Sequence, residues 1–364
     1  MPIKDNDSSI ALQQQVKHAI SSKEALFIHG GKSKLFYGNT VDATALDISD
    51  HTGVVDYDPT ELCITVRAGT RLTEIENLLT ENNQVLPFEP PHYVDLNQPS
   101  DSATIGGAIA SGISGPRRAF TGSVRDAILG VKIINGEGEI VTFGGQVMKN
   151  VAGYDLSRLM VRSQGTLGVI LNVSLRVLPK PSHELTLTLE LPQEKALQYC
   201  QELRQQQLPI TATAWLNNQL NLRLSASEAT LEACKQKLAA NEIDEGMEFW
   251  KSIRDHYHNF FDDRNKPLWR FSVPPATDII SHFEDDQLIE WGGAQRWIHA
   301  NTPENIIHSI AKSNKGYATL FQSNQTNVTR FTVLDPALLQ LHRALKKKMD
   351  PHAVFNPNRI YQGL

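Results

Sequence analysis

The first part of the chain alternates short apolar runs with polar stretches, a pattern that predicts strands separated by turns. Apolar and β-branched residues indicate strands over residues 25–28, 54–57 and 62–67. In "TRLTEIENLLTENN", helical spacing places four residues on one face, namely Leu72, Ile75, Leu78 and Leu79. Thr70 is the predicted N-cap of this helix, and the prolines of "PFEPPHY" end it, because proline cannot continue a helix.

The following segments predict the rest of a first domain. "AILGVKIINGEGEIVTFGG" contains two strands joined by a hairpin at Asn135 and Gly136. "GYDLSRLMV" predicts a short helix, and "TLGVILNVSLRVLPKP" predicts a long strand. That strand ends in Pro-Lys-Pro, so we place the domain boundary after residue 180.

A second region begins with the period-two strand "ELTLTLEL". Its further predicted elements are a helix over 194–205, strands near 211–216 and 219–224, and a helix over 228–240. The order strand, helix, strand, strand, helix predicts a ferredoxin-like α+β layer. A last helix over Pro336–Met349 leads into the tail "DPHAVFNPNRIYQGL".

Composition narrows the class of protein. A chain of 364 residues with 40% hydrophobic residues can bury two sizeable cores. The net charge of −5 and the pI near 6.2 argue against a nucleic-acid-binding protein. "MPIKDNDSSI" lacks the apolar core of a secretion signal, and no stretch has the apolar length of a transmembrane segment. The three cysteines are too scattered for an iron–sulfur cluster or structural zinc and fit a reducing compartment, so we expect a cytoplasmic protein.

Two glycine-containing stretches predict contact with a phosphate-bearing cofactor. In "FIHGGKSKLFYG", consecutive N–H groups of a tight turn, with lysines beside them, would form an anion-binding concavity, although a plain β-turn is the alternative. The ending "GKS" is not a P-loop, because Leu26 stands where that motif needs glycine, and no G-x-G-x-x-G occurs.

The second stretch is "ATIGGAIASGISGPRRAFTGSVRDA", which predicts a helix start whose N–H groups at Ile105, Gly106 and Gly107 face a phosphate. Further glycines would let the backbone pass close to a flat ligand, and Arg117, Arg118 and Arg125 would balance phosphate charge. The alternative is a crowded loop that packs for its own sake. A third loop, "SQGTLG", favours the cofactor interpretation.

These motifs, together with "KNVAGYDLSRLM" and "DPHAVFNPNRIY", resemble the FAD-binding domains of the vanillyl-alcohol-oxidase (PCMH) type. Within that type the chain is similar to the E subunits of bacterial glycolate oxidase, and "FWKSIRDHYHNFF", "PLWRFSVPP", "WGGAQRW" and "ATLFQ" extend the similarity into the second region. The resemblance implies an α+β fold with a two-subdomain FAD-binding domain (1–180), a smaller ferredoxin-like cap (181–332), and a C-terminal helix and tail (333–364) that returns to the FAD domain.

The resemblance also implies noncovalent FAD and a set of residues around it. Near the pyrophosphate it places Gly30, Gly31, Lys32, Ser33, Lys34, Ala103, Thr104, Ile105, Gly106 and Gly107. Along the ribityl chain and flavin it places Gly112, Ser114, Gly115, Gly122 and Ser123, and at the adenosine end or flavin edge Gly165, Gly168, Val169 and Ile170. Two departures stand out. Lys32 replaces a usual third glycine, and we expect it to keep a negative φ; Gln164 replaces a usual carboxylate.

The catalytic residues are harder to assign. Oxidation of a 2-hydroxy acid needs a cation for the carboxylate and a base for the hydroxyl proton. Arg270 and Arg296 are candidate cations, whereas Arg254 is expected to be structural. His256 and His258 form an H-x-H pair, but on a helix they would not face each other, so we expect a solvated helix face and no metal. His29 would suit a covalent flavin link, but noncovalent FAD is preferred. "FEDDQ" and the lysines 346–348 are expected to be solvated.

The family context implies partners and a reaction. It implies a second FAD-containing subunit, an iron–sulfur subunit, and oxidation of glycolate, with D-lactate as a second substrate, to the 2-keto acid. Attachment to the inner face of the membrane through partners is the alternative to a purely cytoplasmic location. Two other functions stay open: a non-redox structural subunit with a degenerate FAD fold, and a self-sufficient flavoenzyme acting on a lactone or nucleotide sugar, against which the cap motifs argue.

Overall fold

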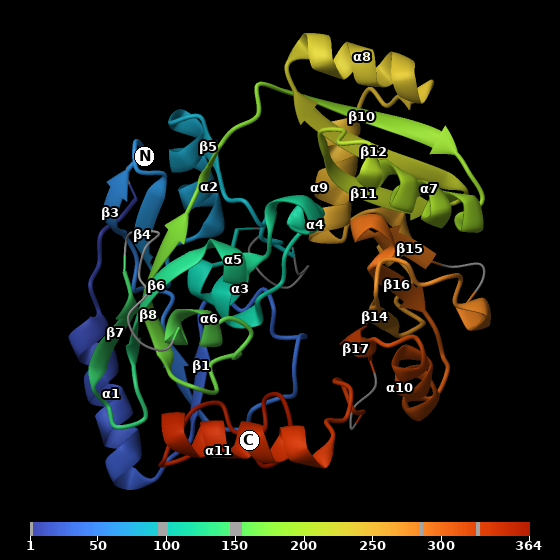
Figure 1. The fold of residues 1–364 in the computed structure, drawn as a ribbon. Helices are drawn as coiled ribbons and strands as arrows, with labels where there is room; N and C mark the ends of the chain where they lie inside the picture. Colours follow the sequence, from blue (N-terminus) through green and yellow to red (C-terminus); the bar gives the residue numbers. More distant parts are fainter. Residues whose placement is uncertain (1–2, 94–100, 146–154, 284–286, 325–327) are drawn as a thin grey trace. The chain divides into compact units, whose positions relative to one another are not determined.

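The computed structural model describes residues 3–93, 101–145, 155–283, 287–324 and 328–364. The chain divides into two compact units (Figure 1). Unit 1 comprises Met1–Ser114, Gly122–Lys180 and Leu334–Leu364, and unit 2 comprises Gly115–Thr121 and Pro181–Val333. The C-terminal helix and tail therefore belong to the same unit as the N-terminal half of the chain.

Unit 1 is built on a five-stranded antiparallel sheet in the order β3-β4-β8-β6-β7. Its strands are β3 (Val54–Asp58), β4 (Cys63–Arg67), β6 (Ile128–Ile134), β7 (Ile140–Gly144) and β8 (Val169–Arg176). The predicted hairpin is confirmed, because β6 pairs with β7 across a turn in which Asn135 N donates to Glu139 O at 2.9 Å. Two smaller pairs accompany the sheet: parallel β1 (Leu26–His29) and β2 (Thr44–Asp47), and antiparallel β5 (Gln84–Val85) and β9 (Leu178–Pro179).

The helices of unit 1 complete a single hydrophobic core. They are α1 (Ser9–Ser22), α2 (Leu72–Glu81), α3 (Ile105–Ser111), α5 (Val124–Ala127), α6 (Leu156–Leu159) and α11 (Pro336–Met349). The predicted apolar face of α2 is buried through Leu72, Ile75 and Leu79. The predicted N-cap is wrong: Arg71 caps α2, while Thr70 is buried and its Oγ1 accepts the N–H of Gly53 at 2.9 Å.

Unit 2 contains an eight-stranded sheet in the order β13-β10-β12-β11-β15-β16-β14-β17. One half consists of β10 (His183–Glu190), α7 (Gln193–Gln205), β11 (Ile210–Leu216), β12 (Gln219–Ala226), α8 (Glu228–Leu238) and β13 (Asn241–Glu242). This is the predicted ferredoxin-like arrangement, and α7 and α8 pack on one face of its sheet through Leu197, Cys200 and Leu231.

The other half of unit 2 extends the same sheet with strands that the sequence pattern did not predict. It contains α9 (Gly246–Asp255), β14 (Leu268–Ser272), β15 (Gln287–Glu290), β16 (Gln295–His299), α10 (Glu304–Ser313), β17 (Tyr317–Gln322) and the 3₁₀ turns η1 (Asn259–Phe261), η2 (Ser281–Phe283) and η3 (Trp291–Gly293). Helix α10 buries Ile307 and Ala311 against Trp269, Phe271 and Ile298 of the sheet.

The short segment Gly115–Thr121, which contains α4 (Arg118–Thr121), leaves unit 1 and becomes part of unit 2. Arg117 Nη2 lies 2.6 Å from Glu184 Oε1. The Arg118 guanidinium lies 4.5 Å from the centre of the Trp291 ring, and Trp291 Nε1 donates to Gly115 O at 3.2 Å. An ion pair, a cation–π contact and a hydrogen bond thus hold this segment.

Candidate functional site

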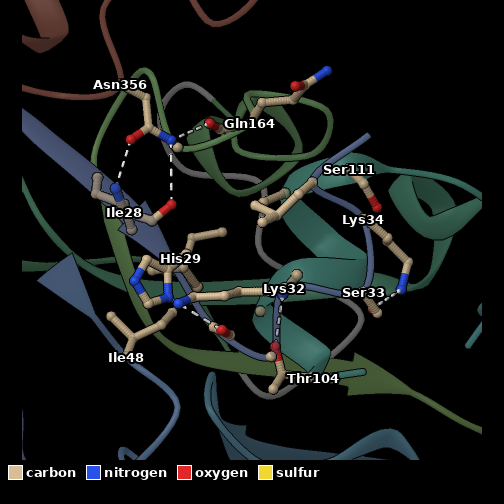
Figure 2. Close-up of a pocket in the computed structure, with 18 of the residues that line it drawn as sticks. Ile28, His29, Lys32, Ser33, Lys34, Ile48, Thr104, Ser111, Gln164 and Asn356 are labelled. Atoms are coloured by element: carbon tan, nitrogen blue, oxygen red, sulfur yellow. Dashed lines mark hydrogen bonds between the residues drawn. The ribbon is translucent and has the colours of Figure 1, made fainter. Parts of the chain in front are cut away.

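The main candidate site is a pocket in unit 1 that contains about 750 Å³ of space, part of it open to solvent. The end of β1, the loop after it, α3, the loop 163–168 and the C-terminal tail line it (Figure 2). All the described residues that line it belong to unit 1, so the pocket can be described within that unit.

The charge of this pocket suits an anion. Lys32, Lys34 and Arg359 bring cationic groups to it, and none of the described residues that line it is acidic. His29, the last residue of β1, is buried there with Nδ1 3.2 Å from Gly30 O and 3.6 Å from Asp47 Oδ1. A phosphate-bearing ligand would therefore meet positive charge in a lining whose described residues carry no carboxylate.

The loop 30–38 offers consecutive backbone donors. Within the described residues, the N–H groups of Gly31, Lys32 and Ser33 have no hydrogen-bond partner. Lys32 has φ +60°, so our expectation of a negative φ is wrong. The chain turns sharply here, because Leu35 N donates back to Lys32 O at 3.2 Å. Successive unpaired N–H groups in such a turn form an anion-binding concavity.

The start of α3 differs from the sequence prediction. Ile105 N donates to Thr70 O at 3.0 Å, Gly106 N donates to Ala68 O at 2.8 Å, and Gly107 N donates to Thr104 Oγ1 at 3.3 Å. The prediction that these three N–H groups face a phosphate is therefore wrong, because bonds within the protein already use them. The helix start packs against the chain segment that follows β4.

Some glycines of the pocket are required by close packing within the protein, and others leave space for a ligand. A Cβ on Gly31 would overlap the carbonyl of Ser102, and a Cβ on Gly106 would lie 2.7 Å from the Cβ of Ala68. At Gly107, by contrast, a Cβ would meet only Thr104 Oγ1, at 3.3 Å, and Gly107 lines the pocket. Gly107 is thus the position at which an added side chain would take up space in the pocket.

The pocket brings together part of the predicted cofactor set. Eleven predicted residues line it: Gly30, Gly31, Lys32, Ser33, Lys34, Thr104, Gly106, Gly107, Gly165, Gly168 and Ile170. Eight others do not: Ala103, Ile105, Gly112, Ser114, Gly115, Gly122, Ser123 and Val169. Ser114 Oγ accepts the N–H of Val124 at 3.3 Å, and Ser123 and Asp126 form a capping box at the start of α5, so these two side chains have structural roles.

Sequence reasoning missed several lining residues, above all Ser111 in α3 and two from the C-terminal tail, Asn356 and Arg359. The motif "DPHAVFNPNRIY" contains both tail residues, so the resemblance pointed to the segment but not to these positions. Gln164 also lines the pocket, and its buried Oε1 has no hydrogen-bond partner. A buried acceptor of this kind can receive a hydrogen bond from a bound ligand.

The two candidate cations lie in unit 2, on opposite faces of its sheet. Arg270 in β14 pairs with Trp297 in β16, so Arg296, the neighbour of Trp297, points the other way. Arg296 is fully buried and donates to the carbonyls of three residues, Thr277, Asp278 and Gly293. Burial lowers the pKa of Arg296 to about 10. Because backbone carbonyls occupy its guanidinium, Arg296 has a structural role.

Arg270 has a different environment. It is buried, with its guanidinium 6.0 Å from the centre of the Trp297 ring and 5.6 Å from that of Phe321. His256 stacks on Phe261 at 3.8 Å, and burial together with the charge of Arg270 holds the pKa of His256 well below its usual value. The expected solvated helix face is wrong for His256, because α9 ends at Asp255 and the imidazole packs among aromatic rings.

Two further expectations can be compared with the structure. His258 was expected on a solvated helix face, but it follows the end of α9. It caps η1 instead, its Nδ1 accepting the N–H of Phe260 at 3.2 Å. Lys346 was expected in a solvated basic face, but it is buried, whereas Lys347 and Lys348 are exposed. Part of the acidic run "FEDDQ" lies outside the described residues.

Comparisons with known proteins agree with this site. The family model for the FAD binding domain (FAD_binding_4) matches residues 7–144. The chain is 43% identical over 362 residues to the glycolate oxidase subunit GlcE of Escherichia coli (strain K12), a match that covers 100% of both chains. It is 31% identical over 134 residues to the glycolate oxidase subunit GlcD of Bacillus subtilis (strain 168), covering 37% of this chain and 27% of that one.

A solved structure of p-cresol methylhydroxylase has the same fold, with a TM-score of 0.72 at 12% identity over 98% of this chain and 88% of that one. It supports the PCMH-type α+β architecture. In the described residues, no helix has the length and apolar character needed to cross a membrane.

Proposed function

Because the chain belongs to the family of the glycolate oxidase subunit GlcE, whose FAD-binding domain it carries, we propose that it is the FAD-binding subunit of a multi-subunit glycolate oxidase. Its complex would oxidise glycolate, and D-lactate as a second 2-hydroxy acid, to the 2-keto acid. A second flavin subunit and an iron–sulfur subunit would be its partners, the latter receiving the electrons. The full-length relationship to a named oxidase subunit is the observation that carries this proposal.

The residues of the pocket fit FAD. The unpaired N–H groups of Gly31, Lys32 and Ser33 would hold the pyrophosphate, with the ammonium groups of Lys32 and Lys34 balancing its charge. The buried and unpaired Oε1 of Gln164 would accept a hydrogen bond from the cofactor. FAD supplies a two-electron acceptor when it is bound. We expect noncovalent binding.

For the substrate carboxylate we propose Arg270. Arg296 is excluded from this role by the backbone carbonyls around its guanidinium, whereas Arg270 lies on the opposite face of the sheet among aromatic rings. A guanidinium in such a poorly solvated setting would pair strongly with a carboxylate. The described residues offer no comparable assignment for the base that takes the hydroxyl proton.

The test is the visible absorption spectrum of the purified chain before and after anaerobic addition of glycolate. Flavin bands that bleach would make this chain a catalytic subunit in its own right. Flavin bands that persist would mean that the chain holds FAD while the substrate reacts on its partner. A colourless protein that takes up no added FAD would contradict the redox role and leave a structural subunit with a degenerate FAD fold.

The charge of the pocket gives an independent check. Lys32→Met removes the exposed ammonium at the turn, and we expect FAD affinity to fall by about tenfold, since one charge-assisted contact is lost. The control is Lys23→Met, which removes another exposed lysine with positive φ, at the end of α1. Titration of flavin-free protein with FAD measures both variants. Equal affinity in Lys32→Met and the unmodified chain would contradict the placement of the pyrophosphate.

A further inference from the structure

Three polar side chains of the C-terminal segment 346–359 reach the backbone of the two pocket loops. Lys346, Asn356 and Arg359 are 8%, 2% and 7% exposed. Each of them bonds to main-chain atoms of residues that precede it by at least 180 positions. Long polar side chains that are buried this fully are held by specific partners. The partners here all lie in or beside the loops 30–38 and 163–168.

Asn356 joins the end of β1 to the loop 163–168 (Figure 2). Its Oδ1 accepts the N–H of Ile28 at 2.6 Å, and its Nδ2 donates to Gln164 O at 2.7 Å. Ile28 stands two residues before Gly30, where the first pocket loop begins. One side-chain amide therefore fixes the distance between the backbones of the two loops.

Lys346 holds the second loop from the other side. Its Nζ donates to Thr166 O, Phe355 O and Asp350 Oδ2, each at 2.7 Å. Asp350 in turn accepts the N–H groups of Val354 and Phe355, at 3.1 and 2.9 Å. A single buried ammonium thus ties the last turn of α11 to the tail and to the loop 163–168.

Arg359 holds the first loop. It donates to the carbonyls of Leu35, at 3.0 Å, and Tyr37, at 2.9 Å, and also to that of Asn39. The fit leaves no spare room, since a Cβ on Gly38 (φ +124°) would lie 2.8 Å from Arg359 Nε. On the second loop, a Cβ on Gly165 (φ +74°) would lie 2.6 Å from Asn356 Nδ2.

We propose that Lys346, Asn356 and Arg359 are positioning residues that preorganise both pocket loops for FAD, so that cofactor affinity depends on the C-terminal segment. This inference rests on the proposed function. Two separate loops carry the groups that would bind FAD. The loop 30–38 carries the unpaired N–H donors of Gly31, Lys32 and Ser33, and the loop 163–168 carries the acceptor of Gln164. They can act on one ligand together only when the spacing of these loops is fixed. The tail bonds supply that spacing before FAD arrives.

The test compares two variants with matched controls in the full-length chain. Lys346→Met is paired with Lys347→Met, which removes the neighbouring exposed lysine of α11. Asn356→Ala is paired with Asn358→Ala, because both asparagines have positive φ, +38° and +61°, so alanine is strained at both. We expect FAD to bind about tenfold more weakly to Lys346→Met and Asn356→Ala, each of which leaves buried groups unpaired. The controls should bind like the unmodified chain.

Titration of flavin-free protein with FAD gives the affinities, and urea unfolding of the same flavin-free samples gives their stabilities. A purely structural role predicts lower stability with unchanged affinity in those molecules that are folded, and this result would overturn the proposal. If Lys346→Met does not fold, Arg359→Lys provides the same test, because it keeps the charge and loses the planar fork that serves several carbonyls. If the unmodified chain binds no FAD, the proposed function itself is wrong.

Discussion

Gly106 and Gly107 are neighbours in α3, but the space around them differs. A Cβ on Gly106 would press on Ala68, whereas a Cβ on Gly107 would enter space beside the pocket. We expect Gly106→Ala to destabilise the flavin-free protein by about 2 kcal/mol, because the site is overpacked. Gly107→Ala should preserve that stability or raise it by up to about 1 kcal/mol, since alanine favours the helix, and weaken FAD binding by about tenfold.

Urea unfolding and FAD titration of the two alanine variants separate these effects. If Gly107→Ala binds FAD like the unmodified chain, the cofactor does not use the space beside this residue. If both variants lose stability equally, the close packing at Ala68 is not what requires glycine at position 106.

Individual residues of the site could be predicted where the sequence signal for their role lies in neighbouring residues. Glycines and lysines that follow a strand at Gly30–Lys34 suggested an anion site from their order alone, and the pocket contains them. Lys346 and Asn356 gave no such signal, because their partners in β1 and the loop 163–168 lie between 180 and 328 positions away. The prediction that the N–H groups of Ile105 and Gly106 face a phosphate failed for the same reason. Their acceptors, Thr70 O and Ala68 O, belong to another segment of the chain.

At the scale of elements, β14 and β16 present two arginines to opposite faces of one sheet. We expect Arg296→Met to lower the free energy of unfolding of unit 2 by about 3 kcal/mol, because the carbonyls of Thr277, Asp278 and Gly293 lose their donor. Arg204→Met, an exposed arginine in the last turn of α7, is the control. Denaturant unfolding measures both. A stable Arg296→Met protein would restore Arg296 as a candidate for substrate binding.

Local sequence signals decided which elements could be predicted. The sequence predicted α11 to the residue, because Pro336 at its start and the lysines near its end are local signals. Strands β14, β15 and β16 were missed because they are buried on both faces, which removes the polar alternation that marks a strand. Helix α1 was missed as well, although Leu12, Val16 and Ala19 have helical spacing.

At the scale of the whole molecule, the two units carry separate spectroscopic probes. All five tryptophans lie in unit 2, namely Trp215, Trp250, Trp269, Trp291 and Trp297. The described residues that line the pocket proposed for FAD all belong to unit 1. Tryptophan fluorescence therefore follows the unfolding of unit 2, while flavin fluorescence follows unit 1, and a variant can be assigned to the unit that it weakens.

The segment Gly115–Thr121 is where this separation can be tested, because it interrupts unit 1 in sequence but packs in unit 2. Arg117→Met would remove the guanidinium that lies 2.6 Å from Glu184 Oε1, leaving Glu184 with the Ser225 hydroxyl at 2.6 Å and Arg223 at 3.9 Å. Since the Glu184 side chain is 30% exposed, water compensates in part, and we expect a loss of about 1–2 kcal/mol in the tryptophan transition. Arg125→Met, an exposed arginine of α5 in unit 1, should leave that transition unchanged. A shift of equal size in both variants would mean that the effect comes from lost charge in general and not from the anchoring of this segment.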